Sequence, residues 1–150
     1  MTGVIVLGVA LVASVVLGSW YRRRNGRFRA PVADTPEPQA LTAEQIGHAL
    51  GEKATLVQFS SAFCAPCRAT RTLLTDVATK LDGVEAVEVD AELQLDLVRR
   101  LDIMRTPTTF VLDARGHVVT RASGLPRREQ VLSVLAGIPG VIVADAHNVD

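Results

Sequence analysis

Hydrophobic residues are arranged differently in the first 21 residues than in the rest of the chain. From Met1 to Tyr21 no side chain is charged, and residues 4–20 are apolar apart from Gly and Ser. A helix rises about 1.5 Å per residue, so this run approaches the roughly 30 Å thickness of a bilayer core. We expect a transmembrane helix over residues 1–21, inserted through residues 4–20 and with Trp20 at the interface.

Five arginines and no acidic residue lie within residues 22–29. A signal peptide carries its positive charge before the apolar run, and a buried core helix is rarely apolar all round, so an anchor is favoured over both. The positive-inside rule then predicts a single-pass membrane protein whose soluble domain is cytoplasmic, with an extracytoplasmic domain as the alternative. Three prolines within residues 30–39 predict an extended spacer, so residues 22–40 are interpreted as a basic collar and linker.

Beyond this linker, helical and strand-like periodicities follow one another. Apolar residues at helical spacing, together with the capping pair Thr42 and Gln45, predict four helices. Compact or alternating β-prone runs predict four strands, with a turn at Gly116 between the last two. The expected helices are 42–50, 67–80, 92–101 and 126–136, and the expected strands are 55–60, 84–90, 108–113 and 117–121. This order predicts an α/β domain over residues 41–136, in which helices flank a central mixed four-stranded sheet.

The tail, residues 137–150, fits either an apolar strap packed on the domain or a frayed end. The formal charge of the chain is zero, but the chain from residue 30 onward has 16 acidic and 11 basic residues, a net charge of −5. Nucleic acid requires a basic surface, so we expect no nucleic-acid partner.

The chain has two cysteines, Cys64 and Cys67, which follow a predicted strand and open a predicted helix. A disulfide that closes so short a loop adds little stability by restricting the unfolded chain. A structural zinc site needs four ligands, and the remaining candidates, His48, His117 and His147, lack ligand spacing. We therefore expect a redox pair, with no metal and no cofactor.

The position of this pair predicts its chemistry. Unpaired N–H groups and the helix dipole at a helix start favour a thiolate at Cys64, the form that attacks disulfides. Pro66 suits the first helical turn, where its missing N–H is not needed. Cys67 lies one turn further and can resolve a mixed disulfide, while Arg68 adds positive potential.

A second motif, Thr106-Pro107, joins a predicted helix to the strand 108–113. Proline here fits either a cis bond in a tight turn or an ordinary trans turn. In either form, the backbone of Thr106 offers an edge to which an extended substrate segment can pair.

A Cys-x-Pro-Cys motif lies between a predicted strand and a predicted helix, and Thr106-Pro107-Thr-Phe-Val-Leu-Asp follows about forty residues later. Over residues 41–136 this combination resembles the thioredoxin superfamily. The resemblance implies a thioredoxin fold, with Cys64 as the attacking and Cys67 as the resolving cysteine. It implies a cis-proline at Pro107, facing the cysteines, and a substrate groove kept open by Gly124. The substrate-contacting residues expected on this basis are Phe63, Ala65, Pro66, Thr106, Pro107 and Gly124.

Three positions depart from the family pattern. Phe63 and Ala65 replace the Trp and Gly that surround the first cysteine in thioredoxins. Gln58 replaces the buried acid that assists proton transfer at the resolving cysteine, and Gln cannot accept a proton. These departures favour a dedicated member of the superfamily with few partners over a general thioredoxin.

We therefore expect a membrane-anchored thiol–disulfide oxidoreductase that acts on protein substrates in the reducing direction. Its electron donor would be a reductase or a membrane relay. The alternatives are a thioredoxin-like binding module without redox turnover and an extracytoplasmic disulfide oxidant or isomerase.

Overall fold

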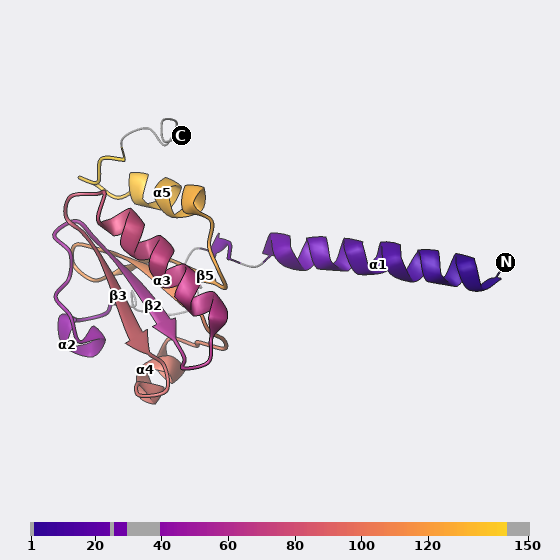
Figure 1. The fold of residues 1–150 in the computed structure, drawn as a ribbon. Coiled ribbons are helices and arrows are strands. Elements are labelled where there is room, and N and C mark those ends of the chain that lie inside the picture. The colour runs from indigo at the N-terminus through magenta and orange to yellow at the C-terminus, as the bar shows by residue number, and fades with distance from the viewer. Residues whose placement is uncertain (1, 25, 30–39, 144–150) are drawn as a thin grey trace.

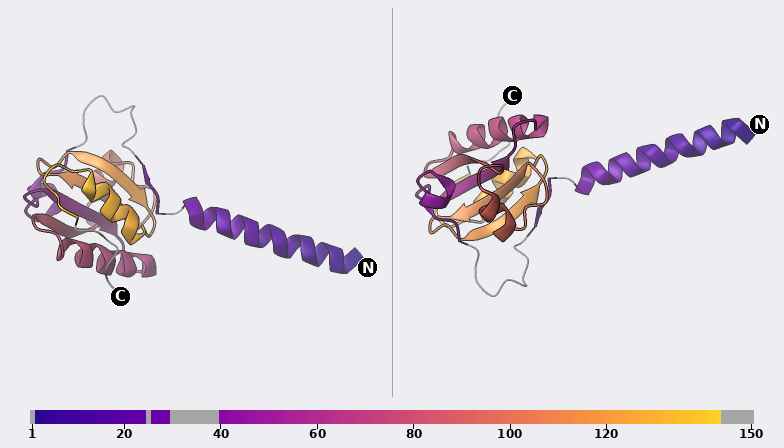
Figure 2. Two further views of the ribbon diagram at one scale, coloured as in Figure 1. Left: turned by 90° about the horizontal axis from the view of Figure 1, so that it is seen from above. Right: turned by 90° about the horizontal axis from the view of Figure 1, so that it is seen from below.

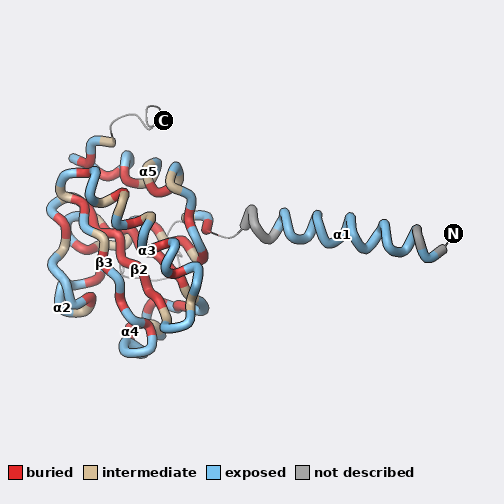
Figure 3. The backbone as a smooth tube through the Cα atoms, in the orientation of Figure 1, coloured by how far each residue is buried: buried red, intermediate tan, exposed pale blue. Residues whose placement is uncertain are grey.

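The structure is a computed structural model that describes residues 2–24, 26–29 and 40–143. Its first element, α1 (Thr2–Arg24), is a 23-residue helix that projects away from the folded domain (Figure 1). The described side chains of α1 are exposed (Figure 3). Within the described ranges no helix is both long and apolar enough to cross a membrane. The helix expected here is present, whereas its transmembrane role stays a prediction.

The expected four strands form a mixed sheet at the centre of the domain. They are β2 (Ala54–Ser60), β3 (Val84–Asp90), β4 (Thr108–Asp113) and β5 (Val118–Ser123). Strand β2 pairs in parallel with β3 and antiparallel with β4, which pairs antiparallel with β5. This confirms the predicted mixed sheet.

A fifth strand was not expected from the sequence. Strand β1 (Phe28–Arg29) pairs antiparallel with the end of β5, so the order is β1-β5-β4-β2-β3. Ala40 forms an isolated bridge with His117, the residue immediately before the same strand. The interpretation of residues 22–40 as a linker is therefore wrong at Phe28–Arg29, because these residues are part of the sheet. The spacer expected at residues 30–39 lies outside the described residues.

Helices cover both faces of the sheet (Figure 2). Residues of α3 (Ala65–Ala78) and α5 (Arg128–Ala136) pack on one face, and residues of α2 (Ala43–Ile46) and α4 (Leu95–Arg100) pack on the other. All four helices were expected, and the capping pair of Thr42 and Gln45 is confirmed.

Three of these helices are shorter than the sequence pattern predicted. Helix α2 ends at Ile46 because Gly47 adopts a left-handed conformation, with φ of 69°, and caps it. Helix α4 begins only at Leu95, so Leu93, within the helix expected over residues 92–101, precedes it and is 81% exposed. Helix α5 begins at Arg128, because Arg127 is its N-cap, and Pro126 therefore precedes the first turn.

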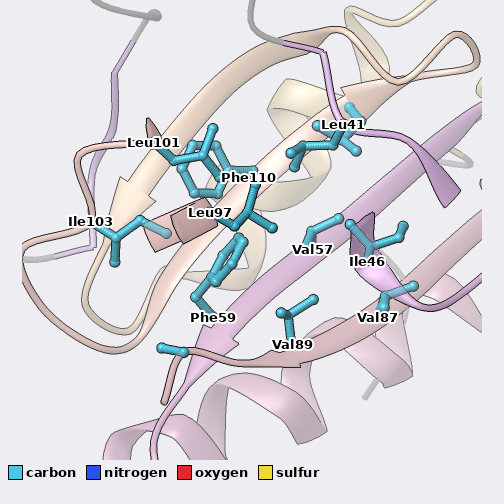
Figure 4. Close-up of a cluster of buried hydrophobic side chains, with 12 residues drawn as sticks. Leu41, Ile46, Val57, Phe59, Val87, Val89, Leu97, Leu101, Ile103 and Phe110 are labelled. Carbon is cyan, nitrogen blue, oxygen red and sulfur yellow. The ribbon is translucent and has the colours of Figure 1, made fainter. Parts of the chain in front are cut away.

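Two clusters of buried side chains hold the layers together. The first contains Phe59 and Phe110, which meet edge to face with ring centroids 5.6 Å apart (Figure 4). The second, on the α3 and α5 face, also includes Ile138 and Val141. The tail therefore packs on the domain up to Val143, and residues 144–150 lie outside the described residues.

Candidate active site

Cys64 and Cys67 are joined by a disulfide bond at the start of α3. Strand β2 ends at Ser60, and a three-residue loop connects it to Cys64, which is the N-cap of the helix. The N–H of Cys67 donates to the Cys64 Sγ at 3.2 Å, as a helix start provides. Pro66 lies in the first turn, as predicted. Cys64 is half-buried, whereas Cys67 is only 2% exposed, so the two sulfurs differ sharply in access.

The Thr106–Pro107 peptide bond is cis, as the resemblance implied. Pro107 is buried, and its carbonyl accepts a hydrogen bond from the Gly124 N–H at 2.7 Å. Thr106 Oγ1 lies 2.9 Å from the hydroxyl of Ser61, in the loop that leads to Cys64. These contacts connect the loop after β2, the turn before β4 and the end of β5. We call Thr106, Pro107 and Gly124 the substrate face.

Gln58 lies beneath the cysteine pair, 1% exposed in the middle of β2. Its Nε2 donates to the carbonyl oxygen of Cys67 at 2.9 Å, so it supports the helix turn that holds the buried cysteine. Its Oε1 is buried and has no hydrogen-bond partner among the described residues. The fold therefore places Gln58 at the site, where it supports the backbone of Cys67. Its amide cannot exchange a proton with the Cys67 thiol as a carboxylic acid could.

A cavity of about 170 Å³ extends from Gln58 between α3 and β3. Arg71 and Glu88 line it and form an ion pair with a nitrogen–oxygen distance of 2.6 Å. The hydrogen bond that Arg71 donates to Glu88 raises the pKa of Arg71 above its ordinary value, so this side chain stays a cation. The cavity therefore has one charged, solvent-facing wall and one buried amide.

The other predicted residues surround the pair at the surface. Phe63, Ala65, Pro66 and Arg68 are all exposed. The side chains of Ala65 and Pro66 have no polar hydrogen, so the loop between the cysteines offers a thiolate only backbone donors. This composition limits how strongly the loop can stabilise the dithiol form.

Two neighbouring features were missed by the sequence reasoning. Ser61 contacts Thr106, and Glu92 Oε1 accepts a hydrogen bond from the Ala62 N–H at 3.3 Å. Both contacts join segments that are 30 or more residues apart in the sequence. No local motif marks such residues, so only the fold could reveal them.

The arrangement suits thiol–disulfide exchange. A thiolate at the accessible position can attack a disulfide, and the second sulfur is already within bonding distance to release the product. The backbone donor at the helix start favours the thiolate form of Cys64.

Comparisons with known proteins agree with this chemistry. The thioredoxin family profile matches residues 38–136. Thioredoxin Y, chloroplastic, from Oryza sativa is 31% identical over 126 residues, which cover 81% of this chain and 74% of that protein. Thioredoxin H2 from Arabidopsis thaliana is 31% identical over 77 residues, which cover 51% of this chain and 57% of that protein. The chain thus spans little more than half the length of this second relative.

The fold is shared with solved structures. Reduced thioredoxin pre-protein from Schistosoma mansoni superposes with a TM-score of 0.50 at 22% identity, over 57% of this chain and 79% of that one. The profile match covers well over half of the chain and contains both cysteines and Pro107. The chain therefore belongs to the thioredoxin family.

Proposed function

We propose that this protein reduces disulfide bonds in protein substrates, with Cys64 as the nucleophile and Cys67 as the resolving cysteine. The contrast in exposure between the two sulfurs supports these roles, since only Cys64 is open to a large substrate. The exposed Phe63 and the half-buried Thr106 flank it and provide contacts for an extended segment.

The reaction proceeds in two exchanges. The Cys64 thiolate attacks one sulfur of the substrate disulfide, which forms a mixed disulfide and releases the other sulfur as a thiolate. Cys67 then loses its proton and attacks Cys64 Sγ. This step releases the second substrate thiolate and leaves the Cys64–Cys67 disulfide, so two electrons pass to the substrate. A dithiol donor, either a reductase or a membrane relay, restores the pair.

The composition of the loop between the cysteines supports the reducing direction. A strongly stabilised thiolate favours the dithiol form and makes a pair oxidising. Here the Cys67 N–H donates to the Cys64 sulfur, and Ala65 and Pro66 contribute no side-chain donor. We expect a reduction potential close to that of thioredoxin, about −270 mV.

The potential is measured on the full chain in mild detergent, equilibrated with dithiol and glutathione buffers and followed by thiol trapping. A value near about −270 mV supports a reductase, and one near about −120 to −180 mV means an oxidant or isomerase. Replacing Cys67 by Ser should trap mixed disulfides with substrates, whereas Cys64→Ser should trap none. If Cys67→Ser accumulates no mixed disulfide, the proposed roles are wrong.

We further propose that α1 attaches the protein to a membrane, with the domain on the cytoplasmic side. The support is the absence of charge from Met1 to Tyr21, the arginines that follow and the exposure of the described apolar side chains of α1. The full chain should stay in the membrane pellet after carbonate extraction. In inside-out vesicles, added protease should digest the domain. Release by carbonate argues against the anchor, and protection from protease argues for the extracytoplasmic orientation.

A further inference from the structure

The segment that follows α1 is docked beside the substrate face. The Gly26 N–H donates to the Ser123 carbonyl at 2.8 Å, and Phe28 pairs with Ala122 in the sheet. We call residues 26–29 the latch. The latch lies outside residues 38–136, the range that matches the family profile.

Gly26 fits its position with almost no free space. It is buried, with φ of 74°, and a Cβ atom there would lie 1.9 Å from the carbonyl oxygen of Leu125 and 2.6 Å from its carbon. Both of these atoms belong to backbone, which cannot rotate away as a side chain can. Only glycine therefore allows the latch and Leu125 to occupy these positions together.

Phe28 fixes the other end of the latch. Its half-buried ring packs against the cluster of apolar side chains between the sheet, α3 and α5. Burial of aromatic surface stabilises this contact, so the latch is held by packing as well as by hydrogen bonds.

Two residues that contact the latch lie on either side of Gly124, a member of the substrate face. Ser123 and Leu125 flank Gly124, whose N–H donates to the Pro107 carbonyl at 2.7 Å. The segment from Ser123 to Leu125 thus lies between the latch and the turn that contains Pro107. A shift of this segment would move Gly124 relative to Pro107 and to the cysteine pair.

We propose that Gly26 and Phe28 are positioning residues, which hold Gly124 against Pro107 and thereby set the affinity for protein substrates. This proposal rests on the reduction of protein disulfides proposed above. Neither residue touches the reacting sulfurs, so the chemical step itself does not depend on them.

The test compares Gly26→Ala with Gly47→Ala in the full chain. Both glycines have positive φ, 74° and 69°, but a Cβ at Gly47 meets nothing within 4 Å. The control therefore reproduces the backbone cost without the clash. With insulin as the protein disulfide, we expect Gly26→Ala to raise KM about fivefold, equivalent to about 1 kcal/mol of binding, with kcat unchanged. Bis(2-hydroxyethyl) disulfide, which is too small to span the face, should be reduced at the wild-type rate.

Hydrogen exchange at the Gly124 amide gives a readout that does not depend on activity. We expect faster exchange in Gly26→Ala than in Gly47→Ala, and an equal rate in both would overturn the proposal. An unchanged insulin KM in Gly26→Ala would also overturn it. Wild-type protein that fails to reduce insulin contradicts the proposed function instead, and the exchange rates then still decide the role of the latch. Phe28→Ala replaces Gly26→Ala in both measurements if the latter does not fold.

Discussion

The two edges of the sheet are built in different ways. Strand β3 forms one edge with seven residues, each paired with its partner on β2, from Ala54↔Val84 to Ser60↔Asp90. Strand β1 forms the other edge with two residues, paired with the end of β5. The first edge lies inside the range shared with the family, and the second lies outside it.

The difference shows two ways in which sequence determines structure. Along β3, buried Val87 and Val89 alternate with exposed Glu88 and Asp90, so the local pattern predicts a strand. At β1 no pattern exists, since two residues cannot show a period. This edge depends on the fit of Gly26 against Leu125 and on the packing of Phe28, and both are long-range contacts.

The largest effect on stability is expected at the β3 edge. Val87→Ala removes two methyl groups from the first cluster and should lower the free energy of unfolding by about 2 kcal/mol. Urea unfolding measures this loss, with Val119→Ala, at an exposed site on β5, as the control. The insulin KM should not change. A rise in KM would mean that both edges support the substrate face and would remove the contrast between them.

A smaller loss of stability is expected at the β1 edge. Phe28 is half-buried, so Phe28→Ala should lower the free energy of unfolding by about 1 kcal/mol. Here the insulin KM should rise as well, because the latch is loosened. Urea unfolding and steady-state kinetics on the same preparation test both parts. A large stability loss without any change in KM would make β1 a purely structural edge.

Asp113, at the hairpin between β4 and β5, should make the free energy of unfolding weakly dependent on pH. Burial alone would raise the pKa of Asp113, but hydrogen bonds from His117 and Arg115 lower it below its ordinary value. A depressed carboxyl pKa stabilises the fold above the unfolded pKa of about 3.9, and this contribution is lost as pH falls through the folded value. Asp113→Asn should lose less stability than wild type between pH 5 and the folded pKa, as measured by urea unfolding across about pH 2–5. Parallel profiles would show that Asp113 is not responsible.

The smallest effect is expected from the ion pair on the surface of β3. Glu88→Gln removes the partner of Arg71, and both side chains are partly exposed. Surface pairs contribute little and are screened by salt. Thermal unfolding should show a slight decrease in the melting temperature at low salt and none in 1 M NaCl. If the decrease in melting temperature persists at high salt, Glu88 stabilises the fold through its packing at the cavity beside Gln58 and not through its charge.

Local patterns in the sequence were sufficient for most of the domain. Periodicity and motif account for the four strands β2 to β5, the helix order, Cys64 at a helix start and Pro107 before β4. Helix lengths were predicted less well, since a capping glycine such as Gly47 stops a helix within an apolar pattern that continues. The contacts of Ser61 and Gly26 could not be predicted, because their partners, Thr106 and Leu125, are distant in the sequence.

The docking of the latch also limits the distance over which the active site can move. Only Asn25 separates the end of α1 from Gly26, so Arg24 and Gly26 are at most about 7 Å apart. Phe28–Arg29 and Ala40 also pair with the hairpin edge of the sheet. With α1 in a membrane, as proposed above, disulfides at the membrane surface would meet Cys64 at a high effective concentration. A longer connection at Asn25 would let the domain of such an anchored protein search a larger volume at a lower effective concentration.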